Sequence, residues 1–231
     1  MTAFEEIERA RALPLVNEDG DPVDLAPGPP LSDAEIGALQ QRVGVTLPTE
    51  LTELLQRCGG LDGVLDGLDF SGRTINDFDF GEVFPHPLGI AQDGFGNFWV
   101  LDLSSAPRDR APVYFVCHDA PVVLYQSPDL THFVHEVVRM YIPPHRSAID
   151  DVHEDRLFQV WRRNPGAVTR RQAQASEDSV LKRFAEELDD RFIVVDLRDA
   201  EIGMGFSWGR HGTRTVLRRH GEQPIFAYAR P

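Results

Sequence analysis

The sequence predicts an α+β fold, in which helices pack on a mixed or antiparallel sheet. Helical segments stand at both ends of the first 145 residues, and short apolar runs separated by Gly or Pro turns lie between them. Strands joined without a helix are antiparallel, because a parallel pair needs a long crossover. After residue 150, two helices and then four strand-like runs predict a small α+β extension.

The chain is expected to open with three helices. Capping boxes, in which a Ser or Thr stands three residues before a Glu, begin the first helix at Thr2 and the second at Ser32. The second helix ends at Gly44, and Pro48 lies in the first turn of a third helix that ends at Gly59. The proline-rich segment between the first two helices predicts a loop with a small hairpin at its Asn-Glu-Asp-Gly turn.

Three strands and a long amphipathic helix complete the main domain. The strands are expected at 98–101, 112–116 and 122–125, and the first follows a turn at 93–97. The helix begins at Ser127-Pro-Asp and ends before Pro143-Pro144. Its apolar residues recur every three or four positions and form one buried stripe: Leu130, Phe133, Val134, Val137, Val138 and Tyr141.

The extension is expected to add either a separate lobe or strands at the edge of the first sheet. Its helices are predicted at 154–163 and 176–188, and its strands at 192–197, 203–208, 213–218 and 225–229. The domain boundaries that follow are 1–30 for a helix and loop, 31–145 for the main domain and 146–231 for the extension.

Cysteine usage and hydropathy predict a cytoplasmic protein. Cys58 and Cys117 form neither a CxxC pair nor a disulfide framework, which is typical of a reducing compartment. The amino terminus is acidic, unlike a signal peptide. The longest apolar run, Ala111–Cys117, is too short to span a bilayer.

The net charge of −14 is unevenly distributed. Residues 1–150 contain 9 Arg, no Lys and 24 acidic residues, a net charge of −15, whereas residues 151–231 carry +1. Such a field repels phosphate backbones and anionic lipid and accelerates encounter with basic partners. We therefore expect a basic protein partner and no direct binding to nucleic acid or membrane. Solubility alone is the competing explanation.

The segment from Leu61 to Glu82 concentrates this charge. It has no helical period, and Arg73 is its only basic residue. Six carboxylates are the candidate partner-binding residues: Asp62, Asp66, Asp69, Asp77, Asp79 and Glu82. A mobile loop that merely keeps the protein soluble is the alternative.

Residues with metal or nucleophilic chemistry favour structural interpretations. His132, His135, Glu136 and Arg139 share the helix face opposite the apolar stripe, which predicts a solvated face with a Glu136–Arg139 pair rather than a metal site. Cys117 and His118 are neighbours on a strand, so their side chains point to opposite faces. We assign no catalytic residue, cofactor or metal. An enzyme or small-ligand binder would need a deep pocket, for example one lined by His118 or His86.

Two glycine-containing motifs resemble known binding signatures. The Asp-Gly-Phe-Gly-Asn run at 93–97 has no third glycine opening a helix, so a hairpin turn is favoured over a dinucleotide site. Near the C-terminus, Trp208-Gly-Arg210 begins a basic run. Its arginines are expected to be solvated on a strand edge, to touch phosphate, or to bind the acidic first domain: Arg210, Arg214, Arg218 and Arg219.

Residues 31–142 resemble the SMI1/KNR4 family of the SUKH superfamily. The matching elements, in chain order, are the helical segment from Ile36 through Gly44 and Leu47-Pro48 to Gly59-Gly60, the Asp93–Asn97 turn leading into Trp99–Leu103, Pro112-Val-Tyr114 with His118, and the closing helix with Phe133. The resemblance implies an α+β domain without an established catalytic site. The chain departs from the family pattern in its Ser127-Pro-Asp-Leu sequence and in its extension.

The resemblance also implies a function. Many bacterial members are taken to be immunity proteins that bind and block toxins, often nucleases, and fungal relatives regulate cell-wall assembly. Together with the charge, it predicts a non-enzymatic acidic binding protein, an immunity protein against a basic toxin domain. A regulatory or scaffold module like the fungal relatives is the alternative.

Overall fold

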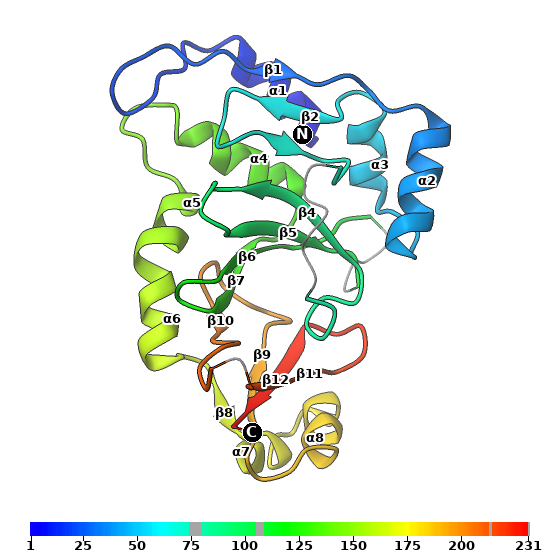
Figure 1. Cartoon of the computed structure of the whole chain (residues 1–231), viewed down its shortest axis with the longest axis vertical. Coiled ribbons are helices and arrows are strands. Elements are labelled where there is room, and N and C mark those ends of the chain that lie inside the picture. The colour runs from blue at the N-terminus through cyan, green and yellow to red at the C-terminus, as the bar shows by residue number, and fades with distance from the viewer. Residues whose placement is uncertain (74–79, 105–108, 213, 231) are drawn as a thin grey trace.

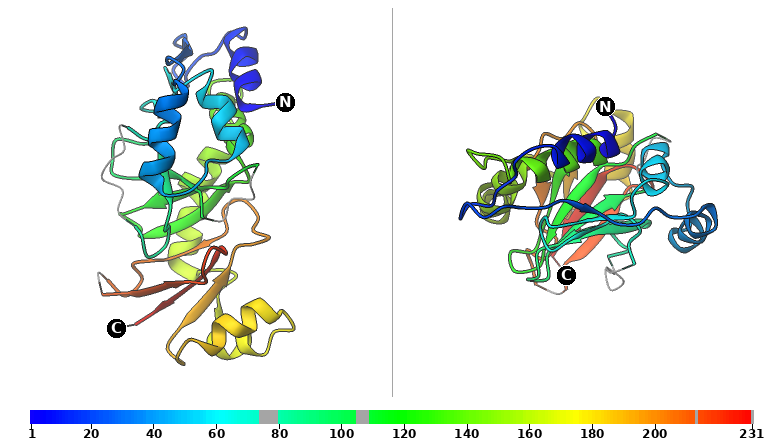
Figure 2. Two further views of the ribbon diagram at one scale, coloured as in Figure 1. Left: turned by 90° about the vertical axis from the view of Figure 1, so that its right-hand side faces the viewer. Right: turned by 90° about the horizontal axis from the view of Figure 1, so that it is seen from above.

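A computed structural model describes residues 1–73, 80–104, 109–212 and 214–230, and it has four layers (Figures 1 and 2). Helices cover one face of a large sheet, a smaller sheet covers part of its other face, and two helices cover the outer face of the smaller sheet. Helices and antiparallel sheets confirm the predicted α+β class.

The large sheet has eight strands in the order β1-β2-β3-β4-β5-β6-β7-β10, and all neighbours are antiparallel. Its strands are β1 (Ala26–Pro27), β2 (Gly60–Asp62), β3 (Leu68–Asp69), β4 (Pro87–Gln92), β5 (Phe98–Asp102), β6 (Val113–Cys117), β7 (Val122–Ser127) and β10 (Gly205–Phe206). β10 belongs to the extension, so the extension adds a strand to the edge of the first sheet, which was one of the two expected arrangements.

The helices of the first layer are α1 (Ala3–Arg11), α2 (Asp33–Val43), α3 (Thr49–Leu55) and α4 (Leu130–Arg139). Both predicted capping boxes are present, and Gly44 ends α2 with a φ of 78°. Pro48 is the N-cap of α3 rather than a first-turn residue, and α3 ends at Leu55, before the predicted Gly59. The predicted stripe on α4 is confirmed, with Tyr141 half-buried just beyond the helix.

A continuous helical stretch leads from the first layer to the second sheet. It consists of α5 (Ala148–Asp150), the π-helix η1 (Asp151–Arg156) and α6 (Leu157–Arg163). The predicted helix at 154–163 therefore begins six residues too late. The proline-rich loop before α2 contains an isolated bridge between Val16 and Pro22, the small hairpin that its turn predicted.

The second sheet has the antiparallel order β11-β12-β9-β8. Its elements and covering helices are β8 (Val168–Thr169), α7 (Arg170–Gln174), α8 (Ser179–Glu186), β9 (Ile193–Asp196), β11 (Val216–Arg219) and β12 (Ile225–Ala229). β1 to β4, β8 and α7 were not predicted, and the strand expected at 213–218 begins only at Val216. Except for β4, the missed elements have two to five residues, and pieces this short depend on their partners more than on their own sequence.

The two sheets share an apolar interface. Val100, Tyr114 and Val123 face the second sheet, whereas their strand neighbours Trp99 and Phe115 face the helices. Because both faces are buried, β5, β6 and β7 are almost entirely apolar instead of alternating with polar residues.

A buried ion pair crosses this interface. Arg219 of β11 donates to both carboxylate oxygens of Asp102 at 2.7 and 3.2 Å, and also to the Val83 carbonyl at 2.7 Å. The side chains of Arg219 and Asp102 are 3% and 0% exposed. The prediction that these arginines are solvated is therefore wrong for Arg219. The alternative, in which an arginine of the basic run binds the first domain, is confirmed for Arg219 by its pair with Asp102. Arg218, its neighbour on the strand, is exposed.

Candidate acidic binding surface

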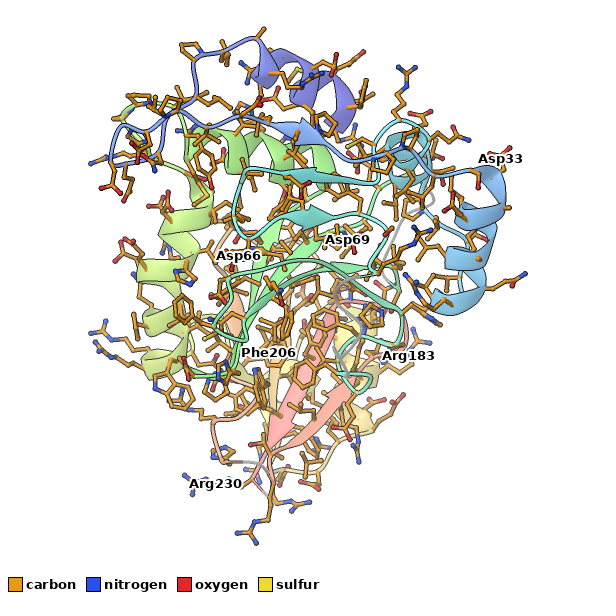
Figure 3. The ribbon with its side chains drawn as sticks, turned by 45° about the horizontal axis from the view of Figure 1, so that its top comes forward. Asp33, Asp66, Asp69, Arg183, Phe206 and Arg230 are labelled. Carbon is orange, nitrogen blue, oxygen red and sulfur yellow. The ribbon has the colours of Figure 1, made fainter. Side chains whose placement is uncertain are left out.

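The six carboxylates of the predicted acidic segment lie in different places. Asp62 and Asp66 are exposed at the turn between β2 and β3. Asp69 lies at the other end of this hairpin (Figure 3), where it accepts hydrogen bonds from the backbone of Ser71 and Arg73. Glu82 is exposed in the loop before β4. Asp77 and Asp79 lie outside the described residues. Only Asp62 and Asp66 are thus close neighbours, and the partner-binding role of all six remains a prediction.

The turn that carries Asp62 and Asp66 is held in a fixed conformation. Gly63, Leu65 and Gly67 all have positive φ, at 89°, 48° and 95°, so the chain reverses within five residues. The Leu65 N–H donates to the Tyr141 hydroxyl at 2.8 Å, which ties the turn to the end of α4. The tie brings the turn close to two other acidic segments.

These segments are the 17–21 turn and the start of η1. Asn17, Glu18, Asp19, Tyr141 and Asp150 line one shallow pocket. Figure 1 shows the 12–25 loop, the β2–β3 turn and α5 on the same side of the molecule. We call this surface the acidic edge. Its seven carboxylates are Glu18, Asp19, Asp62, Asp66, Asp150, Asp151 and Glu154.

The carboxylates of the acidic edge are not neutralised within the described chain. None of the seven forms an ion pair with a described residue. The extension behaves differently, because Arg198 binds both Asp178 and Asp196, and Asp190 lies between Arg170 and Arg171. The acidic edge therefore carries part of the protein's negative charge in a form that no described residue neutralises.

The carboxylates of the acidic edge repel one another, and this repulsion affects the pKa of Asp150. Partial burial raises the pKa of its carboxyl, and the negative charges of Glu154, Glu18 and Asp151 raise it further. Burial also raises the pKa of Tyr141, with added effects from Asp150 and Asp66. A cation placed among these groups would relieve the repulsion.

An exposed aromatic side chain adjoins the acidic edge. Phe95 is 76% exposed at the tip of the β4–β5 turn, the hairpin that its sequence predicted. Asp93 fixes this turn by accepting from the backbone N–H groups of Phe95 and Asn97 at 2.9 and 3.1 Å. The turn lies beside Asp66, whose Oδ2 would be 2.6 Å from a Cβ at Gly94. An apolar side chain next to unpaired charge is suited to anchor a protein partner.

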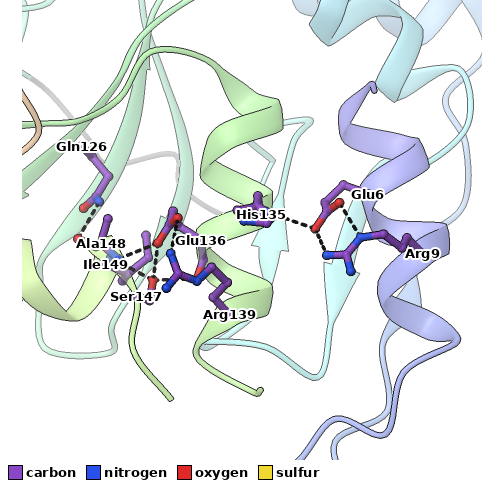
Figure 4. Close-up of polar contacts among 9 residues, drawn as sticks. All are labelled: Glu6, Arg9, Gln126, His135, Glu136, Arg139, Ser147, Ala148 and Ile149. Carbon is purple, nitrogen blue, oxygen red and sulfur yellow. Dashed lines mark hydrogen bonds and ion pairs between the residues drawn. The ribbon is translucent and has the colours of Figure 1, made fainter. Parts of the chain in front are cut away.

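The residues weighed for a metal site hold the helices together instead (Figure 4). His135 Nδ1 lies 2.9 Å from the buried carboxylate of Glu6, and the predicted Glu136–Arg139 pair is present at 3.1 Å. This face is solvated in part, because α1 packs against it and the His135 side chain is 40% exposed. Within the described part of the chain, no three His, Cys, Asp or Glu side chains are grouped to hold a metal ion.

The other candidate histidines are also in structural contacts. Cys117 is buried in the core, whereas His118 is half-exposed beside Asn97, so the predicted opposite orientation is confirmed. His86 Nδ1 contacts the Val43 carbonyl at 2.8 Å, where it secures the end of α2.

Part of the acidic edge was missed by sequence reasoning. Asp62 and Asp66 were predicted, whereas Glu18 and Asp19 were noticed only as turn residues. Asp150, Asp151 and Glu154 could have been found from the sequence, since four of the six residues from Asp150 to Asp155 are acidic. Their proximity to residue 66 depends on the fold and is not visible in any local pattern.

Comparison with known proteins gives one match. Residues 30–136 match the SMI1 / KNR4 family (SUKH-1), a range that runs from just before α2 into α4. No curated protein and no solved structure matched. The match includes Asp62, Asp66 and Phe95 and excludes the other parts of the acidic edge. Among the described helices, none has the length and apolar character needed to cross a bilayer.

Proposed function

Residues 30–136 of this chain form a SMI1/KNR4 (SUKH-1) family domain, and from this premise we propose that the protein binds a basic protein partner at its acidic edge, as an immunity protein that covers a toxin domain. Members of this family are often immunity proteins. The single observation that carries the proposal is the acidic edge, a group of seven carboxylates that form no ion pair with a described residue.

The charge of the edge provides fast and selective capture. Two like charges about 4 Å apart repel by roughly 1 kcal/mol in water, and a cationic partner converts this repulsion into attraction. Complementary charge raises association rates and rejects partners of the same sign. Lysines and arginines around a nuclease active site, which bind phosphate, present the matching field.

Phe95 supplies the apolar part of the contact. Its ring is exposed on a turn whose backbone is already fixed by Asp93, so its burial costs little ordering of the main chain. Aromatic anchors of this kind set the dissociation rate, whereas the surrounding charges set the association rate. The proposal assigns no chemical step to the protein itself.

The test uses two matched sets of four neutralising substitutions in the full chain. The edge variant carries E18Q, D19N, D62N and D66N, at exposed side chains that make no hydrogen bond with a described residue. The control variant carries E177Q, E186Q, E187Q and E201Q, at exposed side chains of the extension that form no ion pair with a described residue. Both sets remove the same charge. Asp69 is left unchanged because it holds its own turn.

Tagged proteins are used to recover partners from the native cell, with elution by salt. The wild type and the control variant are expected to retain the same basic protein, and the edge variant is expected to lose it. Expression of that partner alone should arrest growth, and co-expression of the wild type should restore it. A partner that is harmless when expressed alone would favour the regulatory or scaffold alternative. Equal retention by the edge variant would contradict the proposed surface.

A further inference from the structure

A second surface of the molecule carries the opposite charge. At the end of the second sheet, a pocket of about 580 Å³ lies between the end of α6, the loop before β11 and the paired ends of β9 and β12. We call it the arginine pocket after four of its lining residues, Arg163, Arg191, Arg210 and Arg230; His211 also lines it. Its described lining contains no carboxylate, although the protein as a whole has a net charge of −14. Figure 3 shows Arg230 at this end of the molecule, away from Asp66.

Three of the arginines have no ion-pair partner among the described residues. Arg163 and Arg230 form no ion pair with a described residue. Arg210 donates to the carbonyls of Trp161 and Arg162 at 2.6 and 3.1 Å, which fixes its position without neutralising it. Only Arg191 has a carboxylate partner, the exposed Asp189 at 2.9 Å. Guanidinium groups held in place without counter-charge are suited to bind an oxyanion.

The wall of the pocket has an unused hydrogen-bond acceptor. Asn164, the cap of α6, has a φ of 49° and is 6% exposed. Its Nδ2 donates to the Tyr228 hydroxyl, whereas its Oδ1 has no hydrogen-bond partner within the described chain. A buried oxygen without a donor is costly, and a ligand hydroxyl or amine placed against it would remove the cost.

We propose that the arginine pocket binds a small phosphate-bearing ligand, with phosphate oxygens on the arginines and a hydroxyl or amine of the same ligand directed to Asn164. A volume of this size fits a small molecule rather than a single ion. Long nucleic acids are disfavoured, because the net charge of −15 on residues 1–150 repels an extended polyanion. This ligand site is independent of the acidic edge.

The experiment is calorimetric titration of the full chain with pyrophosphate, with AMP and with a short single-stranded oligonucleotide at low salt. The test variant is R163Q/R230Q, which removes charges that make no ion pair. The control is R183Q, which removes one charge from an exposed arginine on α8 that forms no ion pair with a described residue. Binding of pyrophosphate or AMP is expected with a Kd below about 1 mM. It should weaken at least about tenfold in R163Q/R230Q and stay unchanged in R183Q.

The His211 ring provides a second measurement. It lies next to Arg210 and Arg230 in the pocket, so its NMR resonance is expected to shift on titration with pyrophosphate in the wild type and R183Q only. The proposal would be overturned if neither pyrophosphate nor AMP bound. It would also be overturned if R163Q/R230Q bound them as tightly as the wild type. Tighter binding of the oligonucleotide than of AMP would also overturn it, in favour of a nucleic-acid surface. Any of these results leaves the proposed capture of a basic partner unaffected.

Discussion

Arg219 forms a buried ion pair across the contact between the two sheets. Its guanidinium and the Asp102 carboxylate are both removed from water, and the Val83 carbonyl accepts a further hydrogen bond. Loss of one member of such a pair leaves the other charge buried without a partner. The arrangement also places an arginine of the extension on an acidic residue of the family domain, as two surfaces of opposite charge would.

The substitution Arg219→Met is therefore expected to destabilise the protein by about 3–5 kcal/mol. Urea denaturation followed by circular dichroism measures the change. The control is Arg218→Met on the same strand, where the side chain is exposed and the expected loss is below about 0.5 kcal/mol. Equal losses in the two variants would show that the buried pair contributes nothing specific.

Asp150 allows a test of repulsion within the acidic edge. Its pKa is raised by partial burial and by Glu154, Glu18 and Asp151, so its ionisation is less favourable in the folded than in the unfolded chain. The carboxylate therefore lowers stability above the raised folded pKa and has no such effect below its ordinary pKa. Asp150→Asn is expected to stabilise the protein at pH 7 by less than about 1 kcal/mol.

At pH 3 the gain from Asp150→Asn should disappear, because the carboxyl is then protonated in both states. Parallel urea titrations of wild type and variant at the two pH values measure the difference. The matched control is Asp155→Asn, which changes an exposed carboxylate five residues further along the chain. A loss of stability at pH 7 in Asp150→Asn would show that the Asp150 carboxylate stabilises the folded protein, and would contradict the repulsion.

At the scale of elements, α4 depends on its N-cap. Asp129 accepts from the His132 N–H at 2.8 Å and from Arg110 at 2.6 Å. Burial opposes ionisation of Asp129, but the hydrogen bonds from His132 and Arg110 lower its pKa overall. A carboxylate with a lowered folded pKa stabilises the protein above its ordinary pKa, and this contribution is lost as the pH falls through the folded value.

Asp129→Ala should consequently cost about 1–2 kcal/mol at pH 7. The difference from wild type should shrink as the pH falls below about 4. Thermal unfolding at pH 7 and at pH 3 measures both effects, and Asp109→Ala, an exposed neighbour in the preceding loop, is the control. A cost that is independent of pH would assign the effect to helix propensity rather than to the charged cap.

Elements with strong local signals could be predicted from the sequence. The capping boxes at Thr2 and Ser32 and the apolar stripe on α4 are set by neighbouring residues, and all are present. β1 and β8 have two residues each, so their pairing with β2 and β9 determines them. The apolar character of β5 to β7 on both faces was a sign of a second covering layer, which the strand assignments alone did not reveal.

At the scale of the whole molecule, much of the large sheet is covered by other layers. The extension buries the part of one face that carries Val100, Tyr114 and Val123, and α1 to α4 cover the other face. A partner can therefore not reach these parts of the sheet without displacing a layer. The acidic edge, formed by segments far apart in the sequence, stays accessible together with Phe95. Its residues could not be grouped in advance because only the packing of α4 brings them together.

The most direct test of partner recognition is the association rate of the full chain with its captured partner as a function of salt. Stopped-flow or surface-binding measurements from about 25 to about 400 mM NaCl span the range in which exposed charges become screened. For the wild type and the E177Q/E186Q/E187Q/E201Q variant, the rate should fall steeply with salt. For E18Q/D19N/D62N/D66N it should be at least about tenfold slower at low salt and nearly independent of salt. A wild-type rate that does not change with salt, or an edge variant that associates as fast as the control, would contradict the account.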